Sequence, residues 1–163
     1  MDAQTPSMTT PPVFSYAGFW KRFGAWIIDK ILLGILFIIL LLPTAGILGL
    51  GALNVDDVTD APLGFLLALT GAYLFTSAGF FILCWLYYAL MESKRGATIG
   101  KLVLGIQVVD MTGGPVSFGR ASGRYFGRLI SSLILGIGFL IAGFTQQKQA
   151  LHDIMSGCLV VKR

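Results

Sequence analysis

Long apolar stretches alternate with shorter polar segments along the chain. The apolar stretches cover residues 23–53, 63–90 and 125–144. A helix needs about 20 predominantly apolar residues to cross the hydrocarbon core of a bilayer. Each stretch meets that length, so the pattern predicts an all-α membrane protein with three transmembrane helices. Pro43 falls within the first stretch, where we expect it to kink or end the helix.

The third stretch allows a second interpretation. Gly136 and Gly138 could break it into a re-entrant hairpin, which is tolerated where protein covers the backbone. The hairpin gives four helices and keeps both ends of the stretch on one side of the membrane. A plain third span instead places Lys148, Lys162 and Arg163 on the other side. The sequence leaves both interpretations open.

The polar segment between the second and third stretches contains a strand signal. Residues 102–109 are apolar and β-branched, and residues 112–115 form a strong turn signal. We therefore predict a small cytoplasmic β-hairpin, with residues 116–118 as the returning strand. In the re-entrant interpretation, residues 159–161 near the C-terminus pair with residues 104–109.

Basic residues indicate the orientation of the chain. The link 54–62 contains three aspartates and no Lys or Arg, whereas the segment 91–124 contains five Lys and Arg residues. Cytoplasmic loops carry the excess of Lys and Arg in membrane proteins. We therefore expect the N-terminus, which precedes Lys21 and Arg22, and the segment 91–124 to face the cytoplasm.

The composition also favours lipid as the solvent. Charged residues make up 12% of the 163 residues and hydrophobic residues 55%, whereas a soluble domain carries about 25% charged residues. The net charge is +4, but the basic residues flank the apolar stretches rather than forming a separate patch. This distribution argues against nucleic acid as a partner. The lipid bilayer is the expected surrounding.

The chain divides into a tail and one domain. Residues 1–15 are rich in Pro, Thr and Ser and predict a disordered N-terminal tail. Residues 16–163 form a single transmembrane domain. The first apolar stretch is longer than the apolar part of a signal peptide, so we expect it to be retained as a membrane anchor.

Two charged residues accompany the first apolar stretch. Arg22 and Asp29 are seven residues apart, which places them on nearly one face of a helix, about 10 Å apart along its axis. A charged side chain well inside the bilayer costs from about 2.5 kcal/mol upward. Asp29 therefore either pairs with Lys30 or an arginine of another segment, or binds a proton or cation.

A second group of charges precedes and enters the third stretch. Arg120, Arg124 and Arg128 are spaced by four residues, and a parallel glycine series lies beside them. On a helix each series forms a stripe, and the glycine stripe allows another helix to approach closely. The arginines either contact lipid phosphates or pair with an aspartate. The glycines are Gly119, Gly123 and Gly127, and the candidate aspartates are Asp29, Asp110 and Asp153.

The remaining polar residues give weaker signals. His152 and Asp153 are adjacent, and a histidine beside a carboxylate can relay protons, although a structural role is the simpler interpretation. Glu92 is expected to form a solvated pair with Lys94 or Arg95. Gly96 and Gly100 match a GxxxG spacing but lie in a polar segment, so no packing role is assigned to them. Cys84 and Cys158 read as two small buried side chains.

Motifs of enzymes and cofactor sites do not occur in the sequence. There is no nucleophile elbow, phosphate loop, zinc motif or dinucleotide fingerprint. We therefore expect a protein that is not an enzyme and that uses no metal or cofactor.

Five short motifs resemble the RDD family of membrane proteins, and together they cover nearly everything after residue 15. They are residues 16–29 (YAGFWKRFGAWIID), 96–101 (GATIGK), 105–110 (GIQVVD), 117–121 (SFGRA) and 150–153 (ALHD). The family is named after one arginine and two aspartates. The resemblance assigns the first two to Arg22 and Asp29, and the second aspartate to Asp153 in preference to Asp110. Cys158 stands where threonine is usual, a mild departure.

The resemblance implies a multi-pass protein of a bacterial inner membrane and says little about activity. Transport of an unknown ligand has been proposed for the family, with cation/proton antiport for some members. Two functions are therefore expected to compete. The first is transport of a cation, proton or small solute by an oligomer, using Asp29 with Arg22 or Arg128. The second is a non-catalytic accessory or scaffold subunit that binds a membrane protein partner.

Overall fold

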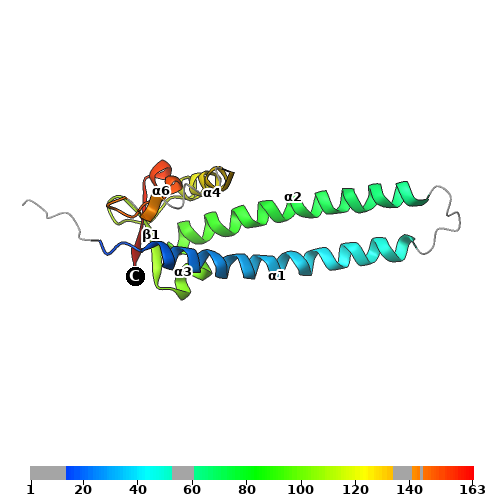
Figure 1. Cartoon of the computed structure of the whole chain (residues 1–163), viewed down its shortest axis with the longest axis horizontal. Helices are drawn as coiled ribbons and strands as arrows, with labels where there is room; N and C mark the ends of the chain where they lie inside the picture. Colours follow the sequence, from blue (N-terminus) through cyan, green and yellow to red (C-terminus); the bar gives the residue numbers. More distant parts are fainter. Residues whose placement is uncertain (1–13, 53–60, 134–140, 144) are drawn as a thin grey trace, which may run out of the picture.

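A long pair of antiparallel helices dominates the protein, and all other elements gather at one end of it (Figure 1). The structure, a computed structural model, describes residues 14–52, 61–133, 141–143 and 145–163. The two long helices are α1 (Phe19–Ala52) and α2 (Ala61–Arg95). We call the remaining part the head; it consists of residues 14–18, α3 (Ile99–Val103), β1 (Ile106–Asp110), α4 (Phe118–Leu133), α6 (Leu151–Ser156) and β2 (Cys158–Lys162).

The helices α1 and α2 account for the first two predicted spans. Within the described residues, Phe19–Ile47 and Leu63–Arg95 are long and apolar enough to cross a membrane. The helix α1 continues through Pro43, so the proline does not end it. The rings of Phe37 and Phe80 lie 4.8 Å apart where the two helices cross. Most other apolar side chains of the pair point outward, as expected for helices surrounded by lipid.

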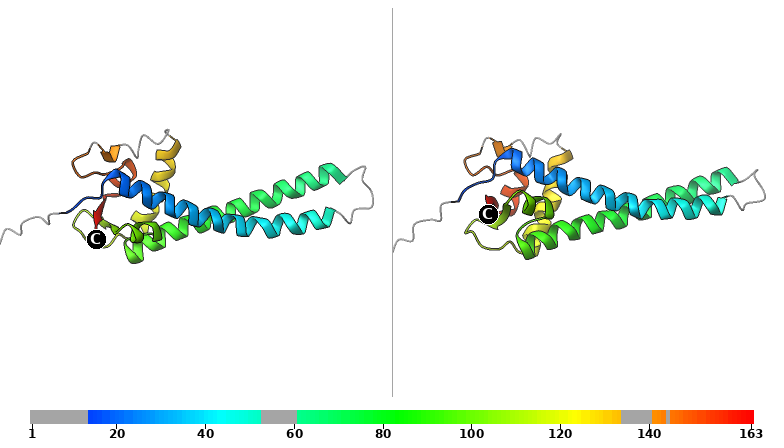
Figure 2. Two further views of the ribbon diagram at one scale, coloured as in Figure 1. Left: turned by 60° about the horizontal axis from the view of Figure 1, so that its bottom comes forward. Right: turned by 90° about the horizontal axis from the view of Figure 1, so that it is seen from below.

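A third or fourth span is not confirmed. Residues 125–133 of the third predicted stretch belong to α4, which runs across the axis of α1 and α2 rather than along it (Figure 2). Gly136 and Gly138 lie outside the described residues. The described helices therefore give two membrane-crossing elements and one crosswise helix at the base of the pair.

A two-stranded antiparallel sheet closes the head. Its strands are β1 and β2, with Val108 opposite Val160 and Val109 opposite Leu159. This pairing is the one predicted between residues 104–109 and 159–161. It also returns the C-terminus to the end of the pair where α1 begins (Figure 1). The re-entrant interpretation predicts that return, and a single further crossing does not.

The predicted β-hairpin does not form, because its first strand pairs with β2 instead of residues 116–118. Residues 116–118 do not form the returning strand, because the Ser117 hydroxyl accepts a hydrogen bond from the Arg120 amide at 3.4 Å and α4 begins at Phe118. A serine in that position caps a helix. The turn before it is held by Asp110, whose Oδ1 accepts bonds from the amides of Thr112 and Gly114, each at 2.8 Å.

Small residues bring the head close to the long helices. The core under the sheet consists of buried apolar side chains, among them Ala17, Ala25, Ala89, Ile106, Val108, Ala121 and Val160. A Cβ on Gly100 would lie 2.2 Å from the carbonyl oxygen of Ala25, so only glycine permits this contact. The expectation that Gly100 has no packing role is therefore wrong.

The glycine stripe of α4 is used at one position. A Cβ on Gly127 would lie 3.2 Å from Cβ of His152, so Gly127 allows α6 to pack closely against α4. Gly119 and Gly123 have open space above them. The predicted stripe thus holds at the residue that faces α6.

Candidate functional site

Asp153 lies at the centre of a cluster of buried charges in the head. Its side chain has no exposed surface and accepts bonds from two arginines of different helices. Arg124 of α4 donates from Nη2 at 2.6 Å and from Nε at 3.1 Å, both to Oδ1. Arg22 of α1 donates to Oδ2, which also accepts the amide of Ala150 at 3.2 Å. Asp153 thereby joins α1, α4 and the start of α6.

Glu92 forms the second centre of the same cluster. The carboxylate is buried near the end of α2. It accepts bonds from Nζ of Lys101 at 2.6 Å and from Nη1 of Arg124 at 3.0 Å. Nη2 of Arg128 approaches it at 3.4 Å. Arg124 therefore lies between both carboxylates, and only 1% of its side chain is exposed.

We define the charge cluster as Arg22, Glu92, Lys101, Arg124, Arg128 and Asp153. Its ion pairs connect α1, α2, α3, α4 and α6. Four cations face two carboxylates, so the cluster carries an excess of positive charge. Buried ion pairs contribute little net stability, whereas removing one partner leaves an uncompensated charge that costs about 3–5 kcal/mol. The cluster therefore specifies one arrangement of the helices more than it adds stability.

The electrostatics of the head follow from burial and from this pairing. Burial alone raises the pKa of Asp153, but Arg124 and the other basic groups outweigh it and hold that pKa well below its usual range. Burial opposes the charge of Arg124 as well, and Glu92 and Asp153 still raise its pKa. Burial lowers the pKa of Lys101 to about 8 despite Glu92.

His152 is neutral at physiological pH. Burial lowers its pKa to about 3, although the Asp153 carboxylate, 3.4 Å from Nε2, opposes that shift. Because the imidazole carries no charge at neutral pH, this contact is not an ion pair there. His152 packs against Gly127, and its role beside the charge cluster is structural.

Asp29 lies outside the charge cluster, which corrects the predicted pairing with Lys30 or an arginine. The carboxylate is buried, and three neutral donors satisfy it: the hydroxyl of Tyr87 at 2.8 Å, the hydroxyl of Thr98 at 2.6 Å and the amide of Gly100 at 2.8 Å. The last two donors belong to the start of α3. Asp29 thus caps α3 from another helix, where the helix dipole favours a negative charge.

The other predicted site residues divide into two groups. Arg22, Arg124, Arg128 and Asp153 come together in the cluster, with His152 beside it. Asp110 holds a local turn, and Arg120 is exposed.

Glu92 is a site residue that the sequence pattern did not indicate. The expected solvated pair with Lys94 or Arg95 is wrong, because the carboxylate is buried. Trp85 and Ala89, seven and three residues earlier on α2, both belong to the core. That helical spacing places Glu92 on the buried face.

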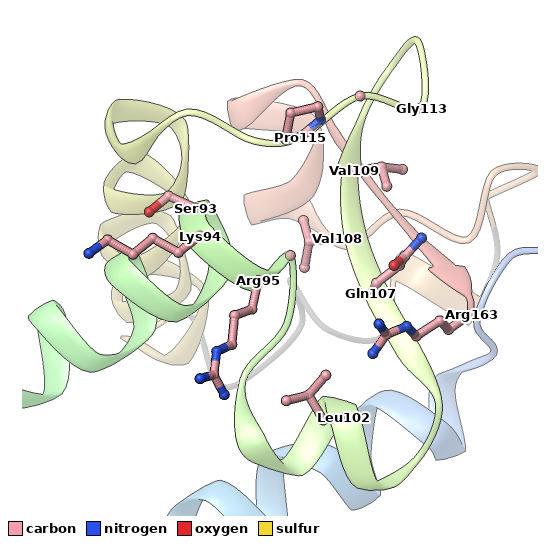
Figure 3. A pocket seen from close by; sticks show the side chains of 12 residues that line it. Ser93, Lys94, Arg95, Leu102, Gln107, Val108, Val109, Gly113, Pro115 and Arg163 are labelled. Carbon is pink, nitrogen blue, oxygen red and sulfur yellow. The ribbon is translucent and has the colours of Figure 1, made fainter.

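Two cavities accompany the site. One, of about 600 Å³, opens at the surface of the head, where Arg95 and Arg163 border it and Lys94 points away (Figure 3). All three side chains are exposed, so this is a solvated hollow. The other, of about 420 Å³, lies between α1, α2 and α4 and is mainly apolar. No group of three metal-ligating side chains occurs among the described residues.

The fold and the site define a class: a membrane protein with two long apolar helices and a head held to their base by buried charges. The RDD family model matches residues 16–157. The chain therefore belongs to the RDD family, as the motifs predicted.

The chain is also similar to three relatives, one of which is named a membrane protein. The chain is 36% identical to "Uncharacterized protein YxaI" of Bacillus subtilis (strain 168) over 89% of its length and 96% of the relative's. It is 28% identical to "Uncharacterized membrane protein YteJ" of the same organism, over 98% of its length and 89% of the relative's. It is 30% identical to "Proline-rich antigen" of Mycobacterium leprae (strain TN), over 91% of its length and 61% of the relative's. No solved structure matches the chain.

Removing the Glu92 charge should destabilise the head. In Glu92→Gln, three cations lose a shared carboxylate, and we expect a loss of about 3–5 kcal/mol, since a buried charge is left unpaired. The thermal midpoint of the purified protein in nanodiscs measures this. The control is Asp110→Asn, a change outside the cluster that keeps the turn's acceptor oxygen. Equal midpoints for the two variants would rule out a structural role for the cluster.

His152 should make the stability depend on pH. Its pKa is about 3 in the folded chain and about 6.5 in an unfolded one. Below pH 6.5 the unfolded state therefore binds a proton that the folded state does not, and stability falls as the pH drops. Between pH 7 and 5 this loss reaches about 2 kcal/mol. As the pH falls across that range, the thermal midpoint of the unmodified chain should decline, and that of His152→Asn should decline less. Parallel curves for the two proteins would contradict the lowered pKa of His152.

Proposed function

We propose that this RDD-family protein is a non-catalytic accessory subunit of the membrane, which binds a partner inside the bilayer through the outward face of α2. One observation carries the proposal: this face is exposed and lined by small residues. Gly64, Ala68 and Gly71, with Phe75 beside them, lie within about 60° of one another around the helix. Phe75 is 82% exposed, and a Cβ on Gly64 or Gly71 would have nothing within 4 Å.

Small residues mark the places where helices approach each other in membranes. The helix α1 does not use this face, because its Phe37 contacts α2 at Phe80, which lies about 150° around the helix from the middle of the outward face. The outward face is therefore left for a different membrane protein as the partner. The charges that motivated a transport function are engaged within the chain, in the charge cluster and at the start of α3.

Transport of a cation, proton or small solute is the second candidate, and Asp29 favours it. This carboxylate is buried in α1 beside the apolar segment, and no cation pairs with it among the described residues. A proton or cation could neutralise such a group. The long helices alone enclose no path, so transport would require an oligomer.

We place the head in the cytoplasm of a bacterial cell, with the long helices in its plasma membrane. The basic residues of segment 91–124 support this side, and the Bacillus relatives support a bacterial membrane. Phe14 and the C-terminus lie at the same end of the long helices, so both are cytoplasmic in this proposal.

The orientation is tested by reporters fused after Arg163. We expect a cytoplasmic reporter, such as a fluorescent protein that fails to fold when exported, to be active, and an alkaline phosphatase fusion to be inactive. The physical reason is that β2 pairs with β1, which follows the basic end of α2. The same reporters inserted in the link 54–62 serve as the matched control and should behave in reverse. An active phosphatase after Arg163 would contradict the orientation.

The partner is tested by affinity purification from native membranes in a mild detergent. We expect one protein to be recovered at fixed stoichiometry. In Gly71→Leu the added side chain overpacks the contact by about 1–3 kcal/mol, so recovery should fall about tenfold.

The control variant is Thr70→Leu, an equally exposed change outside the outward face. Recovery of this chain only with itself would contradict an accessory role. Cation-dependent proton flux in liposomes, lost in Asp29→Asn and kept in Asp110→Asn, would contradict it as well and favour transport.

A further inference from the structure

The cleft between α1, α2 and α4 combines basic and apolar side chains. It encloses about 420 Å³, which lies within the range of about 300–1,000 Å³ typical of ligand pockets. Lys30 of α1 and Arg128 of α4 are its two basic residues. Its apolar lining comes mainly from Leu33, Phe37, Phe80 and Phe81. The cleft can therefore accept a molecule with an anionic end and an apolar end.

The position of Lys30 along α1 matches the level of lipid headgroups. Residues 31–50 carry no charged side chain, and these 20 residues span about 30 Å, the thickness of the hydrocarbon core. Lys30 directly precedes that segment, so it lies where the core ends. On α2, Tyr87 and Tyr88 belong to the aromatic cluster that favours the same interface.

The positive charges of Lys30 and Arg128 are not fully balanced by carboxylates of the described residues. Lys30 is exposed, and no carboxylate lies within 4.0 Å of it among the described residues; its ammonium lies 5.9 Å from the ring centre of Trp26. Arg128 reaches Glu92 only at 3.4 Å, and that carboxylate already accepts closer bonds from Lys101 and Arg124. An anion in the cleft would balance this excess.

We propose that the cleft binds an anionic phospholipid, with the phosphate between Lys30 and Arg128 and an acyl chain along the apolar lining. Basic pockets between transmembrane helices at the cytoplasmic side bind anionic headgroups in this manner. Inorganic phosphate shares the charge chemistry but gains nothing from the phenylalanines. The lining therefore selects the lipid as the source of the phosphate. This site is separate from the outward face of α2, so either proposal can fail without the other.

The test is native mass spectrometry of the full chain, delipidated in a mild detergent. Dioctanoyl phosphatidylglycerol, dioctanoyl phosphatidylcholine and inorganic phosphate are titrated separately. We expect phosphatidylglycerol to bind about tenfold more tightly than phosphatidylcholine, the value of one charge-assisted contact. Inorganic phosphate should not bind at the same concentrations.

Two variants locate the site. Lys30→Gln should lower the affinity for phosphatidylglycerol to that for phosphatidylcholine, while the matched control Lys21→Gln, exposed on the same helix but outside the cleft, should not. Gly34→Leu keeps both charges and fills the cleft, since nothing lies within 4 Å of a Cβ there. It should weaken the binding of both lipids.

Three results would overturn the proposal: equal affinity for the two lipids, equal effects of Lys30→Gln and Lys21→Gln, or inorganic phosphate binding as tightly as phosphatidylglycerol. The last result would assign the basic pair to a free anion. Because Lys30 makes no ion pair with the described residues, Lys30→Gln tests the site without removing a contact of the charge cluster.

Discussion

The arrangement of the head depends on one buried guanidinium. Arg124 is shielded from solvent and donates to Glu92 at 3.0 Å and to Asp153 at 2.6 Å. A guanidinium stays charged in a protein, so its burial requires both carboxylates in place. Because each carboxylate also accepts bonds from other cations, α1, α2, α3, α4 and α6 must adopt their positions together. A partly formed cluster would leave a buried charge unpaired, which disfavours alternative arrangements.

This constraint also explains why the end of the chain returns to the beginning. Asp153 follows the third apolar stretch, yet it pairs with Arg22, 131 residues earlier. The strand β2 then pairs with β1, and Tyr16 bridges to Val161. The ion pairs and the sheet place the two ends of the domain side by side at the base of the long helices. The head is thus one unit that includes Phe14 and the C-terminus, and the long helices extend from it.

Local patterns predicted part of this structure. The two long helices followed from apolar length, and the pairing of residues 104–109 with 159–161 followed from β-branched runs. The sequence also offered Asp153 as a partner of the arginines, but not Glu92, because ion-pair partners depend on which face of a helix meets which neighbour. Glu92 has Lys94 and Arg95 nearby in sequence, but Lys94 lies about 160° away around α2. Arg95, about 60° away, is exposed and borders the hollow at the surface of the head. Asp29 has Lys30 beside it, and its partners instead come from Tyr87 and the start of α3.

Arg128 connects the charge cluster to the cleft between α1, α2 and α4. It approaches Glu92 on one side, and its guanidinium lies 4.7 Å from the ring centre of Tyr88, which lines the cleft. An anion bound beside Arg128 would therefore stabilise the position of α4 that the cluster requires. Linkage makes this effect reciprocal: whatever the anion adds to the stability of the head, the assembled head adds to the affinity for the anion. If the cleft binds an anionic lipid as proposed, the membrane balances the excess of cations over carboxylates in the charge cluster.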